Sequence, residues 1–256
     1  SSDLVANPLA FPPSCKSALQ DMYNFIADRG LNAFMAEYQN DPQSDTEAET
    51  NQLTDLKVLS KATGPQRLLM PEGATYLTAT IDLGKYACHW QVTAWLPNDA
   101  GFVIDYGVQE VVGTQITSDK VQIDAALLSA LRAWRESMLA ADYCTHTGEV
   151  KQINVAMVDS GEFTDAVYQF VLEAGGPFIA SKGMGDTYKT TEVAGRQNCN
   201  HYYINYVTAN NHKAVPLYHL DTNFWKQRCH DAWLTPTLNE DNSFRAGALT
   251  LFAVKT

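Results

Sequence analysis

The sequence predicts an α/β protein built on a mixed central sheet that helices flank. Strand-like segments with short connections come first, at residues 75–84, 87–97 and 101–111, and such a run forms an antiparallel meander. Apolar strands that alternate with helices follow, and this pattern is typical of parallel strands. A chain of 256 residues with 45% hydrophobic and 18% charged residues is long enough to bury a sizeable core.

The meander is delimited by turn signals. Gly84-Lys85 separates the first strand, TYLTATIDLG, from the second, ACHWQVTAWLP, and the turn PNDAG precedes the third, GFVIDYGVQEV. A helix is predicted over 122–139, because Leu127, Leu131 and Trp134 recur on one side of it.

Two strand–helix units come next. We expect a covered strand at 153–161, a helix over 164–175 with Thr164 as its cap, and a second covered strand at 177–183. A hairpin over 201–220, turning at Asn210-Asn211, and a helix over 221–234 close the order.

A meander that continues into parallel strand–helix units is the arrangement of the ribonuclease H fold, here with a hairpin insertion. In that RNase H-like sheet the first and fourth strands lie side by side. Asp82 ends the first strand and Asp159 ends the fourth. We therefore expect the two carboxylates at the same edge of the sheet.

The N-terminal part differs in composition. Residues 17–38 carry a helical apolar pattern that is broken at Arg29-Gly30, and a polar, acidic stretch follows. We expect two parts: a helical segment with a linker over 1–54, and a compact domain over 55–256.

Composition excludes several classes of protein. No run approaches 18 apolar residues, and the N-terminus lacks the pattern of a signal peptide. Five scattered cysteines without a C-x-x-C pair favour a reducing compartment and not a disulfide framework. The net charge of −11 is unusual for a nucleic-acid binder. Any grip on DNA or RNA must be local, mediated by metal, or supplied by another part of a larger machine.

Asp82 and Asp159 are the candidate metal ligands. Two unpaired carboxylates at close range repel each other, and a divalent cation removes that cost. Asp221, at the start of the last helix, is the best-placed third ligand, and Lys182 could contact a phosphate. Each has an ordinary alternative: a turn residue for Asp82 or Asp159, an N-cap for Asp221, and a solvated lysine for Lys182.

Other catalytic motifs are missing. There is no H-E-x-x-H, no G-x-S-x-G and no G-x-x-x-x-G-K-[ST], so zinc, nucleophile-elbow and P-loop chemistry are not supported. The IDLGK turn is a weak match to the phosphate loop of sugar kinases and actin-like ATPases, because it carries no Ser or Thr hydroxyl.

Three segments together resemble the nuclease domain of the large terminase subunit of tailed bacteriophages: TATIDLGKYACHWQVTAWLPNDAGFVIDYGV, VAMVDSGEFTDAVYQFV and FIASKGMG. The upstream GLNAFMAEYQNDP resembles the segment that joins the ATPase motor of that subunit to its nuclease. The resemblance covers roughly residues 30–185, and the rest follows more loosely.

The resemblance implies an endonuclease that uses Mg2+ or Mn2+, with two ions expected, and that cuts concatemeric double-stranded DNA. It carries the first two family acids onto Asp82 and Asp159, while the third is Asp221 or, failing that, Glu240 or Asp241. The implied partners are the terminase ATPase domain, which this sequence does not contain, the small terminase subunit and the portal. The implied location is the cytoplasm of an infected bacterium, with no membrane contact.

Two other functions are compatible with the residues. One is a non-catalytic docking module of the same fold, in which the acids are structural. The other, which the poor phosphate loop disfavours, is an actin-like or sugar-kinase-like phosphotransferase.

Overall fold

The computed structural model describes residue 23 and residues 52–188, 192–193, 196–197, 200–208 and 214–253. The chain divides into two compact units, Ser1–Gln52 and Leu53–Thr256, and every element below belongs to the second. The helix predicted over 17–38 lies outside the described residues except for Tyr23, which is helical. The expected division into 1–54 and 55–256 stays a prediction.

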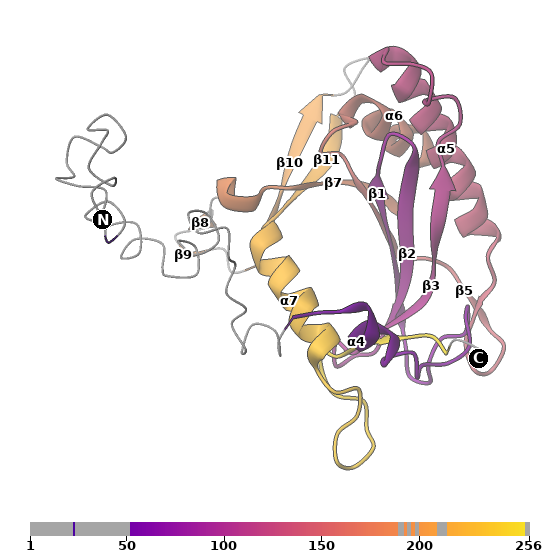
Figure 1. Ribbon diagram of the computed structural model, residues 1–256, viewed down its shortest axis with the longest axis vertical. Coiled ribbons are helices and arrows are strands. Elements are labelled where there is room, and N and C mark those ends of the chain that lie inside the picture. Colours follow the sequence, from indigo (N-terminus) through magenta and orange to yellow (C-terminus); the bar gives the residue numbers. More distant parts are fainter. Residues whose placement is uncertain are drawn as a thin grey trace, which may run out of the picture. The chain divides into compact units, whose positions relative to one another are not determined.

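An eight-stranded mixed sheet forms the centre of the second unit, in the order β10-β11-β7-β6-β1-β2-β3-β12 (Figure 1). Its strands are β1 (Tyr76–Leu83), β2 (Ala87–Trp95), β3 (Gly101–Glu110), β6 (Val155–Asp159), β7 (Phe178–Gly183), β10 (Tyr202–Thr208), β11 (Ala214–Leu220) and β12 (Leu249–Leu251). β1, β2 and β3 are antiparallel, whereas β1 with β6, β6 with β7 and β7 with β11 pair in parallel. The predicted RNase H-like mixed sheet is confirmed.

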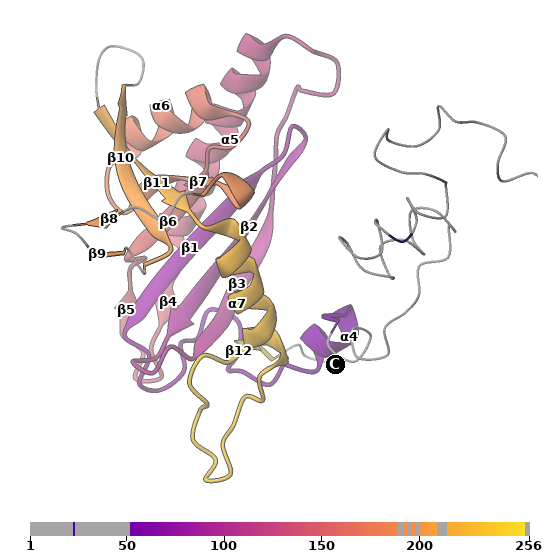
Figure 2. The ribbon, with the colours of Figure 1, turned by 90° about the vertical axis from the view of Figure 1, so that its left-hand side faces the viewer.

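Helices lie on both faces of this sheet (Figure 2). α5 (Lys120–Ala140) and α6 (Thr164–Ala174) cover one face, and α7 (Thr222–Leu234) crosses the other. The main core lies between the sheet and the α5–α6 pair, where Phe178 meets the rings of Trp134 and Phe170 edge to face. Of the described helices, none is long and apolar enough to span a bilayer.

The hairpin insertion is present as β10 and β11, while its predicted turn at Asn210-Asn211 lies outside the described residues. Several small elements had no clear sequence signal: α4 (Asp55–Leu59), β4 (Tyr143–Cys144), β5 (Val150–Lys151), η2 (Gly185–Thr187), β8 (Glu192–Val193), β9 (Arg196–Gln197) and the parallel edge strand β12. Strands of two or three residues are too short to show a period in sequence.

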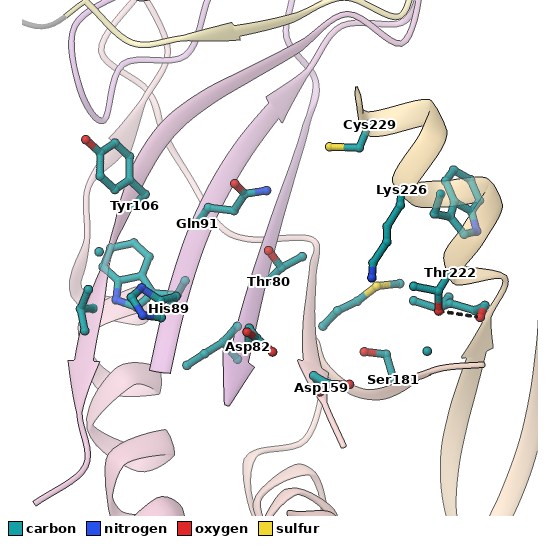
Figure 3. A pocket seen from close by; sticks show the side chains of 18 residues that line it. Thr80, Asp82, His89, Gln91, Tyr106, Asp159, Ser181, Thr222, Lys226 and Cys229 are labelled. Atoms are coloured by element: carbon teal, nitrogen blue, oxygen red, sulfur yellow. Dashed lines mark hydrogen bonds between the residues drawn. The ribbon is translucent and has the colours of Figure 1, made fainter. Parts of the chain in front are cut away.

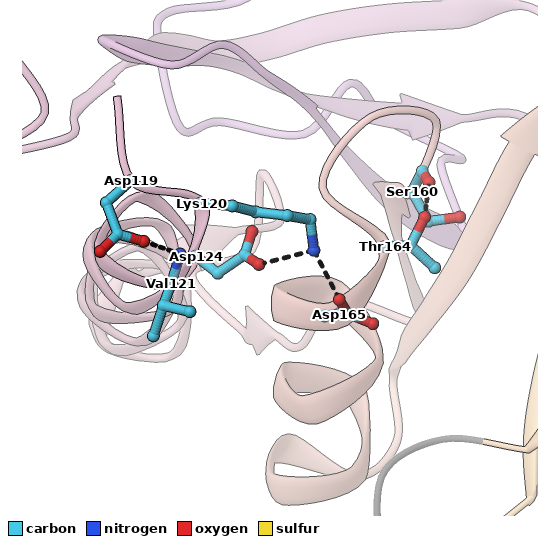
Figure 4. Close-up of polar contacts among 7 residues, drawn as sticks. All are labelled: Asp119, Lys120, Val121, Asp124, Ser160, Thr164 and Asp165. Atoms are coloured by element: carbon cyan, nitrogen blue, oxygen red, sulfur yellow. Dashed lines mark hydrogen bonds and ion pairs between the residues drawn. The ribbon is translucent and has the colours of Figure 1, made fainter. Parts of the chain in front are cut away.

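The starts of α5 and α6 are tied together (Figure 4). Asp119 caps α5 by accepting a bond from the Val121 amide at 2.9 Å, and Lys120 pairs with Asp165 of α6 at 2.6 Å. The prediction that Thr164 caps α6 is wrong. Thr164 is the first residue of the helix, and its hydroxyl donates back to the Ser160 carbonyl at 3.0 Å. Threonine hydroxyls commonly bond to a backbone carbonyl four residues earlier, and a hydroxyl used in this way is not available to cap the helix.

Candidate active site

Parallel pairing brings polar residues from distant parts of the chain into one row. Ile81 is paired with Val158, so Asp82 and Asp159 are the next residues on two neighbouring strands. Asp82 lies opposite His89, and Asp159 lies beside Ser181. His89 of β2, Asp82 of β1, Asp159 of β6 and Ser181 of β7 therefore lie side by side across the sheet, with the two acids at the edge where the sequence predicts them.

A second row lies two residues back on the same face. Thr80 pairs with Gln91 of β2 and with Met157 of β6, and Gln91 pairs with Tyr106 of β3. Both rows line a cleft of about 760 Å³, which α7 closes on the other side with Thr222 and its neighbours (Figure 3). Asp82 and Asp159 thus both line this cleft, on the face of the sheet that α7 covers.

The environments of the two acids differ. Asp82 is exposed, so its place within an apolar strand reflects strand alternation and not burial. Burial raises the pKa of the Asp159 carboxyl, and the charge of Asp82 raises it further. Hydrogen bonds from the Gly161 and Ser160 amides and the charge of Lys182 act in the opposite direction on that pKa. The pKa stays raised, so the two hydrogen bonds and Lys182 do not fully compensate for the burial of the Asp159 charge and its repulsion by Asp82.

Acids elsewhere in the fold have cationic partners. Arg67 pairs with Asp105 at 2.6 Å, and Arg132 pairs with Glu173 at 2.7 Å. Within the described part of the chain, neither Asp82 nor Asp159 makes an ion pair. Two adjacent carboxylates without a cation are the oxygen donors that Mg2+ and Mn2+ prefer, so the pair fits a hard divalent cation.

The predicted third ligand lies apart from this pair. Asp221 is the N-cap of α7, where its carboxylate accepts a bond from the Phe224 amide at 3.2 Å and bonds His201 Nδ1 at 2.9 Å. The hydrogen bond from His201 holds the pKa of the Asp221 carboxyl below its usual range. Across the described residues, no three His, Cys, Asp or Glu side chains gather as a metal site. The ligand role of Asp221 stays a prediction.

Glu240 and Asp241 follow the opposite end of α7, and the Asp241 carboxylate accepts bonds from the amide and hydroxyl of Ser243. Lys182 lies between Ser181 and Gly183, which line the cleft, so strand alternation directs it to the other face. It still lies close enough to lower the pKa of Asp159.

Sequence reasoning missed three residues that the cleft brings together. Thr80 and Ser181 share the sheet face of the acids, and Lys226 reaches toward them from α7 (Figure 3). Period-2 alternation from Asp82 and Asp159 could have indicated Thr80 and, through the neighbouring strand, Ser181. Nothing in the sequence indicates which face of α7 looks at the sheet.

Comparison with protein families matches residues 22–242 to the terminase large subunit gpA, endonuclease domain. The chain belongs to this family. The predicted resemblance is confirmed, and the family is that of a nuclease domain of a DNA-packaging terminase.

Curated proteins offer no match to the chain. Among solved structures it is similar to a Ppx/GppA family member from Aquifex aeolicus, at 11% identity and a TM-score of 0.29 over 42% of this chain and 35% of that one. An exopolyphosphatase from Cytophaga hutchinsonii follows, at 15% identity and a TM-score of 0.25 over 42% and 34%. The chain spans about a third of the length of these structures, and the likeness supports no inference about function.

Proposed function

We propose that this terminase nuclease domain is a Mg2+- or Mn2+-dependent endonuclease that hydrolyses phosphodiester bonds of concatemeric double-stranded DNA. The observation that carries the proposal is the pairing register of β1 and β6, which makes Asp82 and Asp159 neighbours without a cationic partner. Such a pair favours a bound cation over the empty state.

The chain supplies the ligands and their geometry. Asp82 and Asp159 would hold the metal, and the Gly161 amide fixes the Asp159 carboxylate by a bond of 3.3 Å. A side chain on Gly161 would come within 3.2 Å of the Asp159 carboxylate, so the glycine permits this close approach. When bound, a pair of such ions supplies positive charge at the phosphate and makes water a stronger nucleophile at neutral pH.

The remaining site residues and the partners are also part of the proposal. Asp221 is the third ligand that the family resemblance favours, with Glu240 and Asp241 as the alternatives, and Lys182 is proposed only as a long-range charge near Asp159. The ATPase motor, the small terminase subunit and the portal would act with the domain, in the cytoplasm of an infected bacterium.

Plasmid cleavage tests the proposal. Supercoiled plasmid is incubated with Mn2+, Mg2+ or EDTA and either the wild-type chain or Asp82→Asn, with Mn2+ binding followed by calorimetry on the same samples. We expect nicking that requires metal and that Asp82→Asn loses together with Mn2+ binding. Asp165→Asn, which removes an acid outside the cleft, is the matched control and should behave as wild type.

The competing function is a docking module in which the acids are structural. A wild-type chain that neither cleaves nor binds Mn2+ would favour that module and overturn the proposal.

A further inference from the structure

α7 separates its side chains onto two faces. Thr222, Trp225, Lys226 and Cys229 follow the i, i+3, i+4, i+7 spacing of one helix face, and all four line the cleft. Gln227, Arg228 and Asp231 line a separate hollow with Asn98 and Asp99. The helix therefore presents one cation, Lys226, to the acids and another, Arg228, away from them.

The start of α7 is fixed close to the end of β7. A Cβ atom on Gly183 would lie 2.6 Å from the Thr222 hydroxyl, so a larger residue there would force one of the two to shift. Lys226 is one helical turn beyond Thr222 on the same face. This placement directs its side chain toward the sheet, with its amino group on the side of Thr80, Asp159 and Ser181 (Figure 3).

Lys226 is the only lysine or arginine among the described residues that line the cleft. It is exposed, and no described acid lies within ion-pair distance of it, including Asp82 and Asp159. An ammonium group that faces two carboxylates across open space without pairing with them leaves room for an anion between the two walls. The surroundings of that anion would otherwise be negative, since the chain carries a net charge of −11.

We infer that Lys226 contacts a backbone phosphate of the DNA strand that enters the cleft. The inference rests on the proposed function and adds a residue that holds the strand from the side opposite the acids. A lysine ammonium is a compact charge with three donors that binds phosphate oxygens without demanding one geometry. One such contact secures the strand over the row of acids and carries no sequence information.

The test separates binding from cleavage. Fluorescence anisotropy of a labelled 20-base-pair duplex is measured in EDTA over a salt titration, for wild type, Lys226→Gln and Arg228→Gln. Lys226→Met, which keeps the apolar stem, is a second variant in case Lys226→Gln disturbs folding, and circular dichroism reports the folding of each sample.

Lys226→Gln should weaken duplex binding by about tenfold, because it loses one charge-assisted contact. The slope of log affinity against log salt should fall by about 1. Arg228→Gln should keep the wild-type affinity and slope, and Lys226→Arg should restore most of the binding, because it returns the charge.

Equal losses of duplex affinity in Lys226→Gln and Arg228→Gln would mean that net charge alone causes the effect. An unchanged salt slope in Lys226→Gln would mean that Lys226 makes no contact with a phosphate. Either result would overturn the inference. If Asp82→Asn abolishes cleavage while Lys226→Gln binds as wild type, the proposed function stands and the inference fails. A wild-type chain that binds no duplex would overturn the inference, while the plasmid cleavage experiment decides the proposed function separately.

Discussion

The two faces of the central sheet differ in chemistry although the same strands build both. Ile81, Val158, Ala180 and Leu217 form a row across β1, β6, β7 and β11 that packs into the core beneath α5 and α6. The next residue on each of the first three strands gives Asp82, Asp159 and Ser181, on the face that looks toward α7. On each of these strands, a residue packed in the core is therefore followed directly by a residue that lines the cleft.

This contrast shows how the fold can present charge at low cost. The core row stabilises the sheet by excluding water, so the neighbouring row needs no apolar side chains of its own. Substitutions on the two rows should therefore affect different measurements. The following predictions test that separation, from the largest expected effect to the smallest.

Asp82→Asn should lower metal-dependent plasmid cleavage by at least about a hundredfold, because a metal ligand contributes several kcal/mol of charge stabilisation in the transition state. The free energy of unfolding should change by no more than about 0.5 kcal/mol, since Asp82 is exposed. Cleavage kinetics and urea unfolding measure the two effects. If this variant cleaves as fast as the wild type, Asp82 is not a metal ligand.

Ile81→Ala should do the reverse. Ile81 is 3% exposed within the core, and its truncation should cost about 2–5 kcal/mol of unfolding free energy. Cleavage per folded molecule should stay within a few-fold of wild type at a temperature where the variant remains folded. Urea unfolding monitored by circular dichroism, beside cleavage on the same sample, checks both. If Ile81→Ala keeps the wild-type free energy of unfolding, the packing of Ile81 in the core does not stabilise the sheet.

Asp159→Asn should raise the melting temperature in EDTA at neutral pH by about 2 °C, because the variant removes an unfavourable charge. The sign follows from the raised pKa of this carboxyl. The wild-type group contributes most stability below its ordinary value of 3.8, and that contribution is lost as pH rises through the folded pKa. The difference in melting temperature between variant and wild type should therefore grow from pH 4 to pH 7.

Glu173→Gln is the control with the opposite sign. Hydrogen bonding by Gln169 and pairing with Arg132 lower the pKa of Glu173, so its charge stabilises the fold above its ordinary pKa. Its removal should not raise the melting temperature at neutral pH. A rise in both variants would mean that net charge, and not the local environment of Asp159, determines the effect.

Asp221→Ser should lower stability only slightly, because serine caps helices about as well as aspartate and only the bond to His201 is lost. The variant removes the carboxylate while keeping the cap. Cleavage more than about tenfold below wild type, beyond any change in folding, would identify Asp221 as the third ligand. Unchanged cleavage would limit it to capping α7.

Much of the fold could be read from the sequence. Period-2 alternation in the first three strands, and apolar runs followed by helices, were enough to predict the mixed sheet and the ends of β1 and β6. The edge strand β12 could not be predicted, since three residues carry no period. The cap of α6 was mispredicted because the hydroxyl of Thr164 has a competing acceptor in Ser160.

What the sequence determined by itself is local: which residues alternate along a strand, where an acid ends that strand, and which family the motifs resemble. What only the tertiary structure decided is which of these residues meet. The register of β1 against β6 makes Asp82 and Asp159 neighbours, and the packing of α7 against the sheet places Lys226 in the same cleft. The physical reason is that periodicity arises within one element, whereas a site arises from the packing of several, and that packing depends on contacts between residues far apart in the chain.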